Sequence, residues 1–144
     1  MKNTACCTAL GVCGAAVAQL FGGWDNGLKT LLLFMVIDYI SGLAVAGIFK
    51  TSPKTDGGAL NSKVCIKGIV KKIMMLCLVA VAYRIDIVTG NNYIRDMVII
   101  ALAANEAISI LENAGLMGIK LPKVLTKAID ILKDKAEEGE TDGK

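Results

Sequence analysis

Two carboxylic acids stand inside long apolar stretches of this 144-residue chain. Asp38 lies near the middle of residues 28–49, and Glu106 lies near the middle of residues 93–118. If both stretches cross a bilayer, each acid sits near the midplane, where inserting an Asp costs about 2.5 to 3.5 kcal/mol. Such a side chain must face a partner helix, a cavity or water. We therefore favour a functional interpretation of Asp38 and Glu106 over a passive hydrogen-bonding one.

Further polar residues share these stretches and follow a helical pattern. At 100° per residue, Asn105, Ser109 and Glu112 fall within about 80° of arc. Glu106 and Asn113 lie roughly 80 to 100° round from Asn105, and Ala103, Ala107 and Ile110 occupy the opposite side. In the earlier stretch, Ser41 shares a stripe with Asp38. The pattern predicts a polar surface that lines a pore or joins subunits, made by Asp38, Ser41, Asn105, Glu106, Ser109, Glu112 and Asn113.

The sequence offers little for enzymatic or cofactor chemistry. It has no histidine, and its five cysteines form no Cys-x-x-Cys pair, so we expect no metal site and no cofactor. It also lacks a Gly-x-x-x-x-Gly-Lys-Ser/Thr phosphate loop and a nucleophile elbow. Nucleic-acid binding would call for aromatic residues among the basic ones, and the lysine-rich segment 50–72 has none. We expect neither an enzyme nor a nucleic-acid partner.

Composition places these residues in an all-α, polytopic membrane protein. Apolar residues make up 54% of the chain and mean hydropathy is +0.57, which argues against a water-soluble globule. At roughly 20 residues per crossing, about four transmembrane helices are expected. The predicted spans are residues 5–23, 28–49, 73–90 and 93–118. The first is only weakly apolar, so it could instead lie flat on the membrane, which leaves three spans and an outer N-terminus.

The basic residues predict the orientation of the chain. Residues 50–72 form the expected cytoplasmic loop, which sets topology and touches anionic headgroups through Lys63, Lys67, Lys71 and Lys72. Residues 121–144 are expected to form a cytoplasmic amphipathic helix followed by a charged tail. Four spans then place both termini in the cytoplasm of a bacterial cell.

Several motifs in order resemble one known family. They are Asp-Tyr-Ile-Ser-Gly at 38–42, Lys-Gly-Ile-Val-Lys-Lys at 67–72, Asn-Glu-x-x-Ser-x-x-Glu-Asn at 105–113 and Leu-Pro-Lys at 121–123. Together they resemble the toxin-secretion/phage-lysis holin family of Gram-positive bacteria and their phages, over about residues 28–132. The run at 105–113 is the most specific part of the resemblance.

The resemblance implies a small protein of the cytoplasmic membrane that forms a homo-oligomeric pore. Through the pore a phage endolysin, or a toxin in some relatives, crosses the membrane at a programmed time, and the cell lyses. No enzyme activity is implied. Two alternatives stay open: a small ion channel or transporter that uses Asp38 and Glu106, and a non-conducting, antiholin-like regulator.

Overall fold

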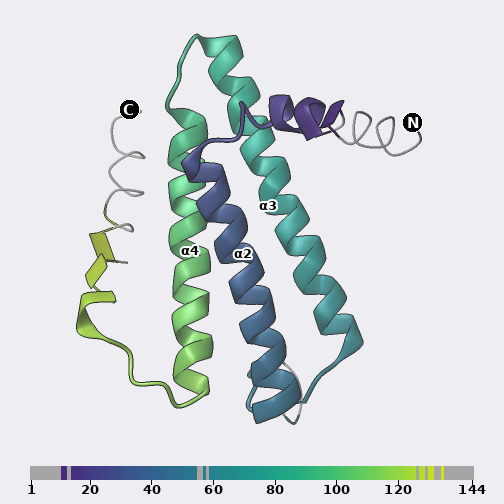
Figure 1. Ribbon diagram of the computed structural model, residues 1–144, viewed down its shortest axis with the longest axis vertical. Helices are drawn as coiled ribbons and strands as arrows, with labels where there is room; N and C mark the ends of the chain where they lie inside the picture. The colour runs from purple at the N-terminus through teal and green to yellow at the C-terminus, as the bar shows by residue number, and fades with distance from the viewer. Residues whose placement is uncertain are drawn as a thin grey trace.

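The computed structural model is all-helical in the part of the chain that it describes. This part comprises residues 11–12, 14–54, 57, 59–125, 127–128, 130–131 and 134. Three long helices, each antiparallel to the next along the chain, form a bundle (Figure 1). They are α2 (Asn26–Ala44), which continues as the π-helical turn η1 (Val45–Phe49), α3 (Ser62–Thr89) and α4 (Ile94–Leu116). Helix α4 packs against both of the others, while α2 and α3 touch each other less.

Polar side chains fix where each long helix begins. The carboxylate of Asp25 accepts a hydrogen bond from the backbone N–H of Leu28 at 2.8 Å and caps α2. Asn61 caps α3 in the same way through the N–H of Lys63, at 2.9 Å. Because of this cap, α3 begins at Ser62, well inside the segment predicted as a loop. The lysine-rich residues 63–72 are therefore helical, and only residues 50–61 connect α2 to α3.

Apolar side chains from all three helices meet along the bundle axis. Leu31 of α2 and Val79 of α3 are fully buried, and the small Ala103 of α4 lets the helix backbones approach closely. The remaining buried members of this core are Leu28, Met35, Met75 and Ile99. The outward faces of α2 and α3 are also apolar, so packing buries only part of the hydrophobic surface.

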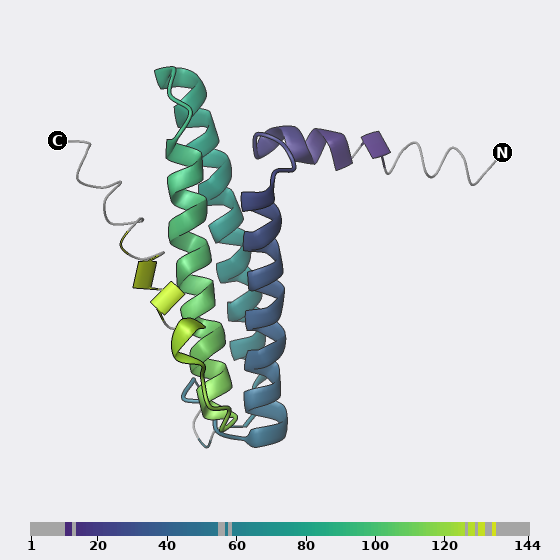
Figure 2. The same cartoon turned by 60° about the vertical axis from the view of Figure 1, so that its left-hand side comes forward.

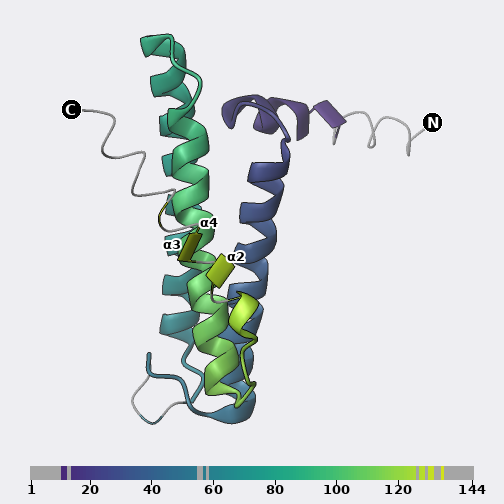
Figure 3. The ribbon, with the colours of Figure 1, turned by 90° about the vertical axis from the view of Figure 1, so that its left-hand side faces the viewer.

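The first predicted span does not join the bundle as a fourth parallel rod in the part that is described. Residues 14–20 are helical and run across one end of the bundle, projecting away from it (Figures 1, 2 and 3). A tight turn ends this helix: the N–H of Gly23 donates to the carbonyl of Ala18 at 2.9 Å, and Gly22 has φ +79°. Residues 5–10 and 13 of the predicted span lie outside the described residues.

Within the described chain, Asn26–Phe49 is the one helix that by length and composition alone could cross a membrane. The four predicted crossings therefore stay a prediction. Of the predicted C-terminal helix, residues 123–125, 127–128, 130–131 and 134 are helical, and residues 126, 129, 132–133 and 135–144 lie outside the described residues.

Replacing Gly22 with alanine should loosen the turn between the transverse helix and α2. A Cβ at this position would lie 2.8 Å from ring carbons of Tyr83, and φ +79° is unfavourable for any residue with a side chain. We expect Gly22→Ala to lower the free energy of unfolding in detergent micelles by about 1 to 2 kcal/mol. Gly14→Ala is the matched control, because nothing lies within 4 Å of its added Cβ. Equal stability of the two variants would contradict the assignment of strain to Gly22.

Candidate functional site

One polar cluster connects the three long helices inside the bundle. We call it the central cluster, and it comprises Asp38 and Ser41 of α2, Lys72 of α3, and Glu106 and Asn113 of α4. The Lys72 ammonium donates to Asp38 Oδ2 at 2.7 Å and also to Glu106 Oε2. Only 15%, 13% and 6% of the side chains of Lys72, Asp38 and Glu106 are exposed. One cation thus bridges carboxylates from the two neighbouring helices.

An amide completes the cluster on the α2–α4 side. Asn113 Nδ2 donates to Ser41 Oγ at 2.8 Å and to Asp38 Oδ1 at 3.2 Å. Ser41 donates in turn to the backbone carbonyl of Asp38 at 3.0 Å. Each of the five side chains of the cluster therefore has a partner, which is what burial inside a bundle requires.

The charges of the central cluster decide what it can do. Two carboxylates face one ammonium, so the formal charge is −1 in a region that is largely shielded from water. Among the described residues, no group of three or more His, Cys, Asp or Glu side chains could hold a metal ion. The arrangement suits an electrostatic clamp between helices, because buried charge pairs hold strongly only while each partner is present.

A cavity of about 450 Å³ opens beside the central cluster. Its polar wall includes Lys72, Glu106 and Glu112, and its apolar wall includes Tyr39 and Leu43. The cavity reaches from the clamp toward the loop end of the bundle, where Ser52 and Leu60 line it. The ionic side chains consequently border open space rather than a closed core.

The outward side of α4 differs from those of α2 and α3. Asn105 and Glu112 are exposed, Ser109 is half-buried, and none of the three makes a hydrogen bond or ion pair with another described residue. In α2 and α3 the exposed side chains include many large apolar ones, whereas in α4 the only one is Leu116. We call Asn105, Ser109 and Glu112 the α4 polar stripe.

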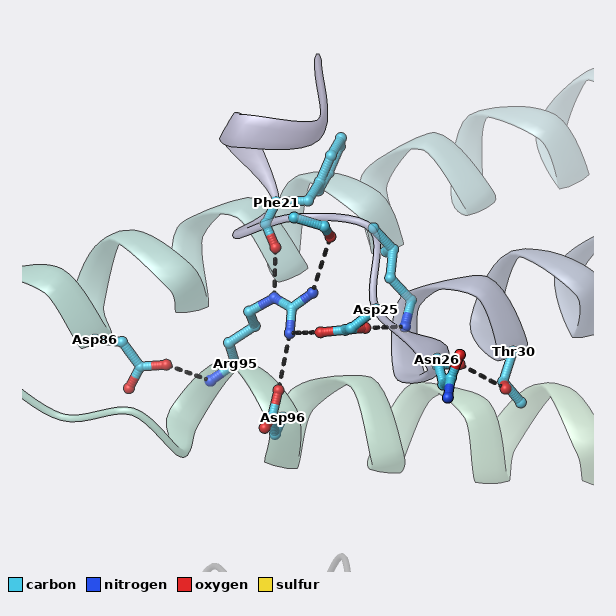
Figure 4. Close-up of polar contacts among 9 residues, drawn as sticks. Phe21, Asp25, Asn26, Thr30, Asp86, Arg95 and Asp96 are labelled. Atoms are coloured by element: carbon cyan, nitrogen blue, oxygen red, sulfur yellow. Dashed lines mark hydrogen bonds and ion pairs between the residues drawn. The ribbon is translucent and has the colours of Figure 1, made fainter. Parts of the chain in front are cut away.

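A second ionic cluster holds the transverse segment to the bundle (Figure 4). Arg95, almost fully buried at the start of α4, donates to the carboxylate of Asp25 and to the carbonyl of Phe21, and its Nη1 lies 2.9 Å from Asp96. Asp86 of α3 accepts from the backbone N–H groups of Ile94 at 3.0 Å and Arg95 at 2.9 Å. Asp86 thereby caps α4 across the α3–α4 turn.

The Arg95 cluster shifts the titration of Asp25. Burial alone would raise the pKa of this carboxyl, but hydrogen bonds from Arg95 and from the N–H of Leu28, together with the positive charge of Arg95, outweigh it. The pKa of Asp25 is therefore lowered from its ordinary value of 3.8. Asp25 both caps α2 and anchors Arg95, so its ionised form serves two contacts at once.

The structure groups the residues predicted from sequence in three ways. Asp38, Ser41, Glu106 and Asn113 meet in the central cluster. Asn105 is exposed on α4, while Ser109 and Glu112 line the open cavity beside the cluster. On the opposite side of α4, Ala103 and Ala107 are buried and Ile110 is half-buried, so this side faces the protein's own core. Lys63, Lys67 and Lys71 are exposed.

Sequence reasoning missed two ion-pair partners. Lys72 was predicted to touch headgroups, and its bonds to Asp38 and Glu106 were not foreseen. On a helical wheel, Glu106 and Arg95 lie on the same side of α4. Arg95 nevertheless pairs with Asp25 and not with Glu106. A usable signal existed, because Asp25 and Arg95 each stand at the outer end of a predicted span and so at a similar depth.

Comparison with known proteins places these features in context. A family model described as bacteriophage holin family matches residues 15–134. An uncharacterized protein of Listeria monocytogenes is 47% identical over 128 residues, covering 88% of this chain and 86% of the relative. A protein named probable holin from Bacillus phage phi105 is 31% identical over 118 residues, which cover 81% of each chain. No solved structure matches significantly.

Removal of the Lys72 ammonium should destabilise the bundle. Lys72→Met leaves two buried carboxylates without their cation, and breaking such a pair typically costs about 3 to 5 kcal/mol. We expect a loss of that order in the free energy of unfolding in micelles. Lys67→Met, at an exposed position of the same helix, should change it by less than about 0.5 kcal/mol.

A third variant separates charge from packing. Combining Lys72→Met with Asp38→Asn and Glu106→Gln removes both uncompensated charges and should recover much of the lost stability. If Lys72→Met alone were as stable as Lys67→Met, the clamp would carry no stabilising role.

The Asp25–Arg95 contact should weaken only under strongly acidic conditions. Because the pKa of Asp25 is lowered on folding, the contact stabilises fully above the unfolded value near 3.8 and is lost as pH falls through the lower folded value. Fluorescence of Trp24, the only tryptophan and the neighbour of Asp25, can follow this in micelles. We expect a transition with a midpoint below 3.8 that is absent in Asp25→Asn. A midpoint above that value would contradict the contact.

Proposed function

The chain belongs to the bacteriophage holin family, and from this premise we propose that it oligomerises in the bacterial cytoplasmic membrane to form a pore. In this proposal α2, α3 and α4 cross the bilayer, with residues 50–61 and the C-terminal segment in the cytoplasm. The pore releases a lytic enzyme of the phage endolysin kind, or a toxin, and lysis follows.

The contrast between the outward faces of the helices carries this proposal. The exposed side chains of α2 and α3 include Leu33, Val36 and Ile40, and Ile73, Met74 and Val81, which suit hydrocarbon. The exposed side chains of α4 include Asn105 and Glu112, for which hydrocarbon is costly. A protomer of this kind lowers its free energy in a bilayer by turning α4 toward other protomers or toward water.

Internal pairing explains how the charged helices α3 and α4 could reside in a membrane. Lys72 bonds to Asp38 and Glu106, and Arg95 bonds to Asp25, so these charges face one another instead of lipid. Paired and hydrogen-bonded charges inside a bundle avoid most of the cost that an isolated charge would incur. A hydropathy average counts every charge as if it were unpaired. It therefore underestimates how well a bilayer could accommodate α3 and α4.

Assembly then uses the two polar groups in different ways. The α4 polar stripe supplies the first contacts between protomers, since it is already exposed in the single chain. The central cluster keeps Asp38 and Glu106 inward until neighbouring protomers or water replace the contacts of Lys72. Rearrangement of this clamp would add further polar surface to a widening lumen.

A selective ion channel is a second candidate, supported by the cavity that borders Lys72, Glu106 and Glu112. The two candidates differ in what they release. A holin releases cytosolic protein when it opens, whereas a selective channel shifts ion gradients and retains protein. An antiholin-like regulator does neither when expressed alone.

Water access to the α4 polar stripe tests the proposal. Single cysteines at positions 105 and 112 are introduced into a variant whose five native cysteines are replaced. After lysis begins, a charged thiol reagent should react at these positions at least about tenfold faster than before, because only a hydrated thiol ionises readily. Release of a cytosolic reporter enzyme is measured in the same cells.

Cysteines at positions 36 and 40 are the matched controls. Val36 and Ile40 are as outward-facing on α2 as the stripe is on α4, so their reaction should stay slow throughout. Equal rates at all four positions would show that α4 has no lumenal side. Fast reaction at 105 and 112 without release of the reporter enzyme would favour the selective channel.

A further inference from the structure

We infer that residues 14–24 form an interfacial segment, which lies flat in the bilayer surface at the end of the bundle opposite residues 50–61. The partner of this segment is the lipid headgroup and upper acyl region. The inference goes beyond pore formation, although it rests on the embedding of α2 proposed above. It makes the protein a three-span protein with its N-terminus on the outer side.

The direction of the segment is the first argument. Helix α2 starts at Asn26, and the helix of residues 14–20 joins it through a short turn and runs across the bundle end (Figures 1 and 2). If α2 follows the membrane normal, a helix transverse to it follows the membrane plane. It lies at the depth where α2 begins, which is the boundary between lipid and water.

The anchoring of the turn is the second argument. The Arg95 guanidinium donates to the carbonyls of Phe21 and Gly23, the latter at 3.5 Å, and its side chain is 8% exposed. Tyr83 packs against Gly22, where an added Cβ would lie 2.8 Å from its ring carbons. Hydrogen bonds from a buried charged group are strong. They hold the chain in its turned path and keep residues 14–20 from continuing as an antiparallel fourth rod.

The surface of the segment is the third argument. Among its exposed side chains are Val17 at 46% and Leu20 at 49%, and Val12, just before the segment, is 64% exposed. Ala18, by contrast, is buried. From residue 11 to residue 24 the sequence contains no charged side chain, and Gln19 is the only polar one apart from Cys13. No described part of the chain covers these apolar residues, and water would be an unfavourable neighbour for so continuous a set.

The position of Trp24 fits the same location. This single tryptophan stands at the junction with α2 and is 50% exposed. Tryptophan is enriched where membrane meets water, because its ring is apolar and its N–H prefers a polar partner. The segment therefore combines a tryptophan at the boundary with an apolar helix that leads away along it.

Depth-dependent quenching of tryptophan fluorescence tests the inference on the full chain in lipid vesicles. The vesicles contain phospholipid brominated either near the headgroup or near the acyl terminus. Trp24 reports the junction directly. Val12→Trp and Val17→Trp, each in a Trp24→Phe background, report the segment, and Val36→Trp in the same background is the control at mid-length of α2. All three new positions are exposed, so each can accept the larger ring.

The two arrangements predict different depths. If the segment is interfacial, Val12→Trp and Val17→Trp are quenched mainly by the shallow bromines, as Trp24 is, while Val36→Trp is quenched mainly by the deep ones. If residues 5–23 span, position 12 lies about 18 Å deeper than Trp24, at 1.5 Å per residue. Deep quenching of Val12→Trp would then overturn the inference alone. Shallow quenching of Val36→Trp would overturn the embedding of α2 and the inference together.

Discussion

The Lys72 ammonium, held between Asp38 and Glu106, is the interaction on which the bundle most depends. It lies on α3, while its two partners lie on α2 and α4, so one cation connects all three helices. Helices α2 and α3 touch each other little by packing, which makes this ionic contact their main polar connection. Removing one partner of such a contact is costly, because the remaining charge is left buried and uncompensated.

Sequence alone predicted the helical class and the residues that would be polar inside it. The expected span 28–49 corresponds to α2 and η1, because an uninterrupted apolar run leaves few alternatives. The start of α3 was harder, since its first turns are lysine-rich and exposed, and only the Asn61 cap marks the boundary. That boundary decides the site: once α3 begins at Ser62, Lys72 lies inside the bundle rather than at its edge.

Pairing between helices could not be read from one sequence for a related reason. A helical wheel gives the direction of each side chain around its own axis but not the rotation of one helix against the next. It separated Asn105 from Glu106 by about 100°. In the structure Glu106 faces Lys72, and Asn105 is exposed. Which of several cations Glu106 would meet depended on packing around small residues such as Ala103 and Ala107.

In the proposed pore, the two ionic clusters would have different roles when protomers assemble. The Arg95 cluster joins α4 to a turn and to the cap of α2, so its contacts can persist while whole protomers move. The central cluster borders a cavity, and its amide and carboxylates could exchange partners with water or with a second chain. A bundle that is fixed at one end and adjustable in its interior can open without unfolding. The exposed α4 polar stripe, next to the adjustable cluster, is where such opening would first meet another protomer.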